Sequence, residues 1–121
     1  MKSNKEIVLE FYEKCFNEWD LSDVDEYMRD DYRQHSPEVA DGKEGFLAFF
    51  RGFISQKPHA EIVHILEDGD LVCVFFRCSF ESGVVAKVFD LYRLEEGKLA
   101  EHWDCTMRVD EMTCPHSNGQ F

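Results

Sequence analysis

Positive charge is scarce in this chain. Its 121 residues include 25 Asp and Glu but only 13 Lys and Arg, which gives a formal net charge of −12 at pH 7. Because contacts to nucleic-acid phosphates need clustered Lys and Arg, this composition argues against nucleic-acid binding. The same shortage of positive charge disfavours binding to an anionic membrane surface.

Long apolar runs are also missing. No stretch approaches the roughly 20 apolar residues that cross a bilayer, and the opening MKSNKEIVLEF lacks the apolar centre of a signal peptide. We therefore expect a cytoplasmic protein with no membrane partner. Hydrophobic residues still make up 44% of the chain, which excludes general disorder. The length and the absence of repeats or linkers predict one domain over residues 1–121.

Paired cysteines are absent as well. The five cysteines are odd in number, form no CxxC pair and lie mostly in apolar stretches, at Cys15, Cys73, Cys78, Cys105 and Cys114. Reduced thiols, mostly buried, are therefore expected. A zinc site at Cys114 and His116 would need further ligands at spacings that the sequence does not offer, so we expect no metal site.

The first half of the chain has apolar residues at helical spacing. A capping-box pattern begins a helix over residues 3–18. A second, short helix is expected over 22–28, and another capping pattern begins a third over 41–56. The segment 31–40, which contains Pro37, is expected to be irregular.

From Ala60 onward the apolar period changes to two, which indicates strands. Turn signals at Asp68-Gly69, Ser82-Gly83 and Glu95-Glu96-Gly97 divide this half into a four-stranded antiparallel meander. Helices that precede a run of strands predict an α+β domain, with three helices on the concave face of a curved, mostly antiparallel sheet. Such a twisted sheet can enclose a pocket.

The last hairpin carries the candidate site. A three-residue loop at 95–97 would pair Asp90 with His102 and Val88 with Asp104. Because side chains alternate along a strand, Asp90, His102 and Asp104 then share one face of the sheet. Three ionisable groups at positions that are normally apolar make a candidate functional site.

The same registers divide the remaining strand residues between two faces. The pocket face is expected to carry Ile62, His64, Cys73, Phe75, Arg77, Val88, Tyr92, Ala100, Thr106 and Arg108. The opposite, convex face is expected to carry Val72, Val74, Phe76, Phe89, Leu91 and Trp103. That apolar surface is larger than monomers usually expose, so it predicts a homodimer through the convex face.

Each candidate side chain has a functional and a structural interpretation. Asp104 is a candidate general base, and the alternative is a carboxylate paired with Arg108 or Arg77. Asp90 and His102 form either an orienting pair, in which the carboxylate selects the imidazole tautomer, or a purely structural hydrogen bond.

Four further residues are candidates for ligand binding. His35 could reach a ligand oxygen at the pocket mouth or could stabilise its own segment, while Gln34 would face differently. Tyr92 could donate to an oxyanion or simply fill the wall. Phe75 and Arg108 are expected to line the same pocket.

Several segments together resemble a known family. They are FYEKCFNEWD, YRQHSP followed by DGKEGFLAFF, VFDLYRLEEGKLAEHWD, and the terminal NGQF. The chain resembles the SnoaL-like polyketide cyclases of the nuclear-transport-factor-2-like superfamily. The resemblance implies a cone-shaped α+β roll over a deep pocket, usually dimeric. It also implies an intramolecular aldol condensation without metal or organic cofactor, with Asp104 as the acid/base. Those cyclases often have His where this chain has Asp90.

Two functions of different classes remain open. The first is a cofactor-independent lyase or isomerase that uses Asp104 and the Asp90–His102 pair on a carbonyl compound. The second is a non-catalytic domain that binds a small hydrophobic ligand. A carboxylate in a dry cavity favours the enzyme, whereas acids neutralised by arginines favour the binding domain.

Overall fold

Helices precede strands along the chain, with one exception. The computed structural model describes all residues from 1 to 121. Its main elements are α1 (Asn4–Tyr12), α2 (Val24–Tyr27), β1 (Met28–Gln34), α3 (Gly42–Phe53), β2 (His59–Asp68), β3 (Leu71–Ser79), β4 (Val85–Glu95) and β5 (Lys98–Arg108). A π-helical turn (Glu13–Asn17) extends α1, and 3₁₀ turns span Ile54–Gln56 and Val109–Glu111. None of the helices combines the length and apolar character that crossing a membrane requires.

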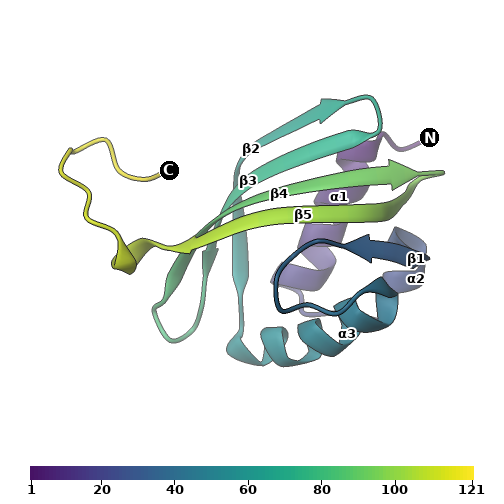
Figure 1. The fold of residues 1–121 in the computed structure, drawn as a ribbon, viewed down its shortest axis with the longest axis horizontal. Helices are drawn as coiled ribbons and strands as arrows, with labels where there is room; N and C mark the ends of the chain where they lie inside the picture. Colours follow the sequence, from purple (N-terminus) through teal and green to yellow (C-terminus); the bar gives the residue numbers. More distant parts are fainter.

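The five strands form one sheet in the order β1-β5-β4-β3-β2. Strands β2 to β5 are an antiparallel meander, and β1 adds to the β5 edge in parallel. Figure 1 shows the sheet curving around α1, with α3 beneath it. Twenty-one buried residues from the helices and strands form one core cluster. The predicted α+β class, with helices packed on a curved and mostly antiparallel sheet, is therefore confirmed.

Two expectations are wrong because of strand β1. Residues 31–34 are not irregular, and β1 precedes α3, so the helices do not all come before the strands. The sequence of β1, MRDDYRQ, buries only Met28 and Tyr32, and its register with β5 shifts between Met28 and Arg33. This irregularity removes the strict alternation by which a strand is recognised. The rest of the expected irregular segment, from His35 to Ala40, has no strand or helix.

The first helix forms as its capping pattern predicts. The backbone N–H of Glu6 donates to the Ser3 hydroxyl over 3.1 Å, which satisfies one of the free donors at the helix start. The helix and the π-helical turn after it bury Val8, Phe11, Tyr12, Cys15 and Phe16. This apolar stripe places Tyr12 under the concave face of the sheet.

The start of α3 departs from its predicted capping box in a way that affects the site. Asp41 occupies the N-cap position but makes no capping bond within the helix. Its carboxylate instead accepts the backbone N–H of Gln34 over 2.7 Å. The hydrogen bond ties the end of β1 to α3. Gly45 of α3 lies so close to Ala40 that an added Cβ would come within 1.9 Å of the Ala40 carbonyl oxygen.

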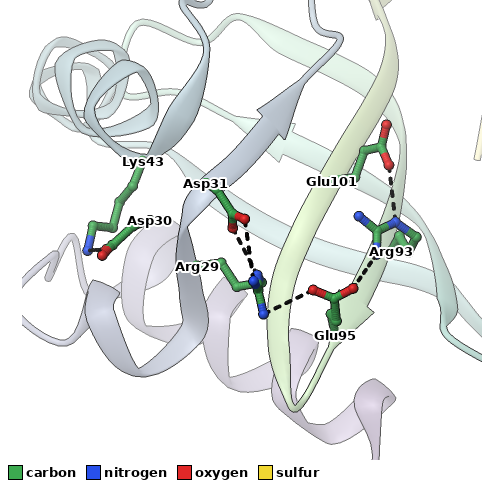
Figure 2. A network of polar contacts seen from close by, with 7 residues as sticks. All are labelled: Arg29, Asp30, Asp31, Lys43, Arg93, Glu95 and Glu101. Atoms are coloured by element: carbon green, nitrogen blue, oxygen red, sulfur yellow. Dashed lines mark hydrogen bonds and ion pairs between the residues drawn. The ribbon is translucent and has the colours of Figure 1, made fainter.

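A chain of ion pairs joins β1 to the β4–β5 hairpin at the outer edge of the sheet (Figure 2). Arg29 contacts Asp31 at 2.9 Å and Glu95 at 3.0 Å, and Arg93 contacts Glu95 at 3.5 Å and Glu101 at 3.1 Å. Nearby, Lys43 of α3 pairs with Asp25 and Asp30. These ion pairs link the short strand β1 to the β4–β5 hairpin through Arg29 and to α3 through Asp30.

The β4–β5 hairpin keeps its predicted faces through a different register. The turn has two residues, Glu96 and Gly97, both with positive φ, so the predicted three-residue loop is wrong. A bulge at Ala100 then leaves Asp90 opposite Asp104 and Tyr92 opposite His102. The predicted pairings are two residues out of register. Because side chains alternate with a period of two, the faces remain as predicted.

Strand β3 has the opposite orientation to the one predicted. The loop before β4 spans residues 80–84, which is five residues rather than two, so Ser79 pairs with Val85 and Val74 with Asp90. The odd shift turns every β3 side chain over. Phe75 and its neighbours at 73 and 77 lie on the convex face. The three β3 residues predicted there, Val72, Val74 and Phe76, instead enter the core, as does Cys78.

On β2 the register shifts between Ile62 and His64. His64 consequently pairs with Phe75 and lies on the convex face, contrary to prediction, whereas Ile62 stays opposite Phe76 on the concave face.

The C-terminal segment projects away from the body before it returns (Figure 1). Its last residue, Phe121, stacks on Phe75 with ring centroids 5.9 Å apart, and the Arg77 guanidinium lies 5.0 Å from the Phe121 ring centroid. Phe121, the last residue of the terminal NGQF, thus contacts the convex face, on the side away from the site.

Candidate functional site

A cavity of about 160 Å³ lies between the concave sheet face and the helices. Fourteen of its twenty lining residues are hydrophobic. Eight of them are phenylalanines: Phe11, Phe16, Phe46, Phe49, Phe50, Phe53, Phe76 and Phe80. The polar lining side chains from β1, β4 and β5 are Tyr32, Gln34, Asp90, Tyr92, His102, Asp104 and Thr106. The cavity therefore combines an aromatic wall with a cluster of acid, base and donor groups.

Asp90 is buried and fully engaged in hydrogen bonds. Tyr12 donates its hydroxyl to Asp90 Oδ2, and Tyr92 donates to the same oxygen over 3.1 Å. The two tyrosine oxygens lie 3.0 Å apart, and His102 Nε2 lies 2.9 Å from Asp90 Oδ1. Both carboxylate oxygens therefore have donors, which offsets the cost of burying the group.

Three tyrosines around Asp90 are held in their neutral form. Burial, with the negative charge of Asp90 as the next cause, raises the pKa of Tyr12, Tyr32 and Tyr92 well above the usual value of 10.0. Because these hydroxyls stay protonated at neutral pH, Tyr12 and Tyr92 remain hydrogen-bond donors to the carboxylate.

The hydrogen-bond partners of the His102 ring indicate which of its nitrogens carries a hydrogen. Its Nδ1 lies 2.7 Å from Gln34 Oε1, and the same oxygen accepts the backbone N–H of Ser36 over 2.9 Å. That second bond orients the Gln34 amide with its oxygen toward His102, so Nδ1 carries the hydrogen. His102 Nε2 faces Asp90 Oδ1 at 2.9 Å. The ring of His102 therefore lies between two oxygen acceptors.

Asp104 differs from Asp90 although the two residues are directly opposed on neighbouring strands. It is half-buried, lines the cavity and has one side-chain partner, the Thr106 hydroxyl at 3.1 Å from its Oδ2. No Lys or Arg lines the cavity, so neither Arg108 nor Arg77 neutralises this carboxylate. Asp104 has the oxygen lone pairs left to meet a ligand.

Four of the seven predicted site residues lie together in this cavity: Asp90, Tyr92, His102 and Asp104. The sequence did not identify Tyr12 as a site residue, and the Gln34 side chain was expected to face another way. A tyrosine on the buried stripe of α1 needs a partner for its hydroxyl, which is the one signal that pointed to Tyr12. Gln34 had no comparable signal, because its place depends on the pairing of β1 with β5.

The other three predicted site residues lie outside the cavity lining. His35 follows β1 and turns to the outer side, where it contacts Glu101 at 2.6 Å and stacks on Trp103. Phe75 lies on the convex face against Phe89, with ring centroids 4.4 Å apart, because the β3 register is odd. The predictions that these two side chains serve the pocket are wrong.

Arg108 ends β5 and pairs with Asp110 at 2.9 Å and Glu111 at 3.5 Å. These acids beyond the strand draw its guanidinium away from the cavity, so its predicted place in the pocket wall is also wrong.

Potential ligands for a metal do not gather in this molecule. No group of three or more His, Cys, Asp and Glu side chains is arranged to hold an ion. Cys114 Sγ lies 3.5 Å from His116 Nε2 in the exposed C-terminal segment, where no third ligand joins them. Cys78, on the cavity wall, is a poor nucleophile, because burial raises the pKa of its thiol to about 12.

The chain belongs to the family described as the SnoaL-like domain, whose model matches residues 8–102. The matched region contains Asp90 and His102 and ends just before Asp104. No curated protein matches the chain.

Solved structures support the fold independently. IdmH of Streptomyces antibioticus, a candidate polyketide cyclase, is 21% identical with a TM-score of 0.75, over 87% of this chain and 92% of that one. TsrD of Streptomyces laurentii is 22% identical with a TM-score of 0.74, over 88% and 90% of the two chains. An NTF2-like protein of Cytophaga hutchinsonii is 18% identical with a TM-score of 0.73, over 88% and 92%. The chain thus has the cone-shaped NTF2-like fold of these neighbours.

Proposed function

We propose that this protein is a cofactor-independent lyase or isomerase of the aldol-condensation type, and that Asp104 is its general base. The observation that carries the proposal is the contrast between the two carboxylates of the cavity. Asp90 is saturated by Tyr12, Tyr92 and His102, whereas Asp104 has a single hydroxyl partner and no cation. A half-buried carboxylate with free lone pairs beside an aromatic wall suits proton transfer to and from carbon.

The chemistry begins at a carbon next to a carbonyl group. Asp104 removes a proton from that carbon, and the electrons of the C–H bond move to give an enolate with its negative charge on oxygen. In an isomerase, the protonated Asp104 returns the proton to another carbon. In an aldol-type cyclisation, the enolate carbon forms a C–C bond to a second carbonyl carbon, and the resulting alkoxide takes the proton back from Asp104.

The Asp90–His102 pair has a positioning role in this proposal. Both nitrogens of His102 face oxygen acceptors, so the ring offers no lone pair to a substrate. Its hydrogen bonds instead hold Gln34 and Asp90 in place on the strands that flank Asp104. A pre-ordered wall of this kind reduces the reorganisation required during reaction.

Asp104→Asn is the decisive test. A thermal-shift panel of aromatic and polyketide-like ketones would first identify ligands, and loss of their α-hydrogen NMR signals in D₂O would then report proton abstraction. We expect Asp104→Asn to slow this exchange by about 100- to 10,000-fold, which is the usual contribution of a general base to the rate. The matched control is Asp110→Asn, because Asp110 is exposed and lies outside the cavity lining.

The alternative function is a non-catalytic domain for a small hydrophobic ligand. The fully bonded Asp90 network and the phenylalanine wall favour it, since both would serve binding alone. Ligands that bind, but whose α-hydrogens exchange with D₂O no faster than in buffer, would support this alternative. Full activity in Asp104→Asn would show that the proposed mechanism is wrong.

We also propose a homodimer through the convex face, on the side of the sheet away from the cavity. The convex patch consists of Leu66, Phe75, Phe89, Leu91 and Trp103, in which Leu66 is 68% and Phe89 47% exposed. Light scattering should give twice the chain mass, and Phe89→Asp should give the monomer. Leu9→Asp on α1 is the control, because Leu9 is exposed elsewhere. A wild-type monomer at micromolar concentration would contradict this proposal.

A cytoplasmic location and a single domain complete the proposal. All five cysteines are free, which suits a reducing compartment. One core cluster joins elements from α1 to β5, which supports a single folding unit.

A further inference from the structure

We propose that the ligand of this cavity is an uncharged carbonyl compound of single-ring size, and that anions and multi-ring compounds are excluded. This inference rests on the proposed function for the carbonyl group. Its size and charge limits rest on the cavity alone.

The volume sets the size limit. A cavity of about 160 Å³ is close to the roughly 150 Å³ that holds one benzene molecule in an engineered protein core. Sites for drug-sized ligands start at about 300 Å³. The space between Asp104 and the phenylalanine wall therefore matches one ring with its substituents, about six to ten non-hydrogen atoms.

Aromatic side chains enforce this limit from the side of α3. Phe49 stacks on Phe53 with centroids 5.5 Å apart, and Phe53 meets the edge of Phe80 at 5.5 Å. All three line the cavity, and Phe49 is 42% exposed, which places it at the mouth. Shortening Phe49 would widen the entrance without disturbing the buried core.

The charges set the second limit. Two carboxyl groups, Asp90 and Asp104, line the cavity, and no Lys or Arg does. Both ring nitrogens of His102 are engaged by Gln34 and Asp90, so no basic side chain faces Asp104. A carboxylate or phosphate ligand would meet the Asp104 carboxylate in a partly desolvated space, where repulsion is stronger than in water. The chain as a whole, at −12, adds to the repulsion.

The test uses three probes whose binding is followed by NMR titration of the labelled protein. Acetophenone is neutral with one ring, benzoate is an anion with one ring, and anthrone is neutral with three fused rings. Because a larger apolar surface alone would favour anthrone, weaker binding of anthrone than of acetophenone would reveal the size limit. We expect acetophenone to bind at least about tenfold more tightly than benzoate as well.

Two variants locate the two limits, and a third serves as the control. Phe49→Ala should raise the affinity for anthrone by roughly tenfold relative to acetophenone, because it removes most of a ring from the mouth. Leu66→Ala on the convex face should leave all three affinities unchanged. Asp104→Asn should raise the affinity for benzoate toward that for acetophenone. Melting curves of each variant would confirm that it is folded.

Three results would overturn the inference: anthrone binding the wild type more tightly than acetophenone, benzoate binding as well as acetophenone, or no binding by any of the three probes. Failure of the proposed function gives a different result. In that case acetophenone would bind as expected, but the exchange of its methyl hydrogens in D₂O would be unaffected by Asp104→Asn.

Discussion

The two faces of the β4–β5 hairpin carry the same kind of histidine–carboxylate pair in opposite settings. On the concave face, His102 and Asp90 have side chains only 10% and 5% exposed. On the outer side, His35 and Glu101 are 41% and 13% exposed, and Arg93 shares the Glu101 carboxylate. The stability of the protein depends on each hydrogen-bond partner of the buried pair, because an unpaired buried charge is costly. In the outer pair the His35 side chain is open to solvent, so this pair contributes less to stability.

The first prediction concerns two adjacent phenylalanines on opposite faces of β3. Phe76 is 1% exposed in the core, and Phe75 lies on the convex face. We expect Phe76→Ala to lower the free energy of unfolding by about 3–5 kcal/mol, since it leaves a cavity. Phe75→Ala should cost about 1 kcal/mol. Urea denaturation measures both, and a larger loss for Phe75→Ala would show that the register of β3 is reversed.

The second prediction breaks each histidine–carboxylate pair in turn. Asp90→Ala removes the acceptor of Tyr12, Tyr92 and His102, and we expect a loss of about 3 kcal/mol in unfolding free energy. Glu101→Ala, the matched change on the outer side, should cost about 1 kcal/mol or less. Equal losses in urea denaturation would contradict the contrast between the two faces.

A third prediction extends the contrast to the packed and open sides of α3. The Cβ of Gly45→Ala would come within 1.9 Å of the Ala40 carbonyl oxygen, whereas nothing lies within 4 Å of a Cβ at Gly52. We expect Gly45→Ala to destabilise by about 1–3 kcal/mol, because backbone has to move. Gly52→Ala should stabilise by up to about 1 kcal/mol through helix propensity. Melting temperatures that rise for both variants would show that α3 sits further from residue 40.

The fourth prediction follows from the tyrosines on the concave face. The pKa of Tyr92 is raised well above 10.0 in the folded state by burial and by Asp90. The unfolded chain therefore loses this proton first. The stability that Tyr92 contributes is complete below pH 10 and is lost as the pH rises toward the folded value.

Tyr92→Phe should make the alkaline fall in unfolding free energy shallower by up to about 1.4 kcal/mol per pH unit. Urea denaturation from pH 9 to pH 11 measures the slope, and pH 7 serves as the internal control. An unchanged alkaline slope would mean that the Tyr92 hydroxyl is accessible to solvent.

Local sequence signals were sufficient for part of the fold and of the site. Ser3 and Glu6 cap α1 as predicted, and the helical and two-residue periods mark α3 and the meander. Asp90, Tyr92, His102 and Asp104 share a face because they lie in one hairpin, where a two-residue slip in register changes partners but preserves faces.

Long-range contacts determined the rest. The orientation of β3 depends on a five-residue loop and that of His64 on a register shift within β2, and neither has a distinct sequence signal. The sequence by itself established the α+β class, the acidic charge and a polar cluster on one hairpin, because these follow from composition and from neighbours along the chain. Only tertiary packing brought Tyr12 to Asp90 across 78 positions and Gln34 to His102 across 68. Those contacts depend on how separate elements dock, and their docking saturates the Asp90 carboxylate while Asp104 keeps a single partner, Thr106.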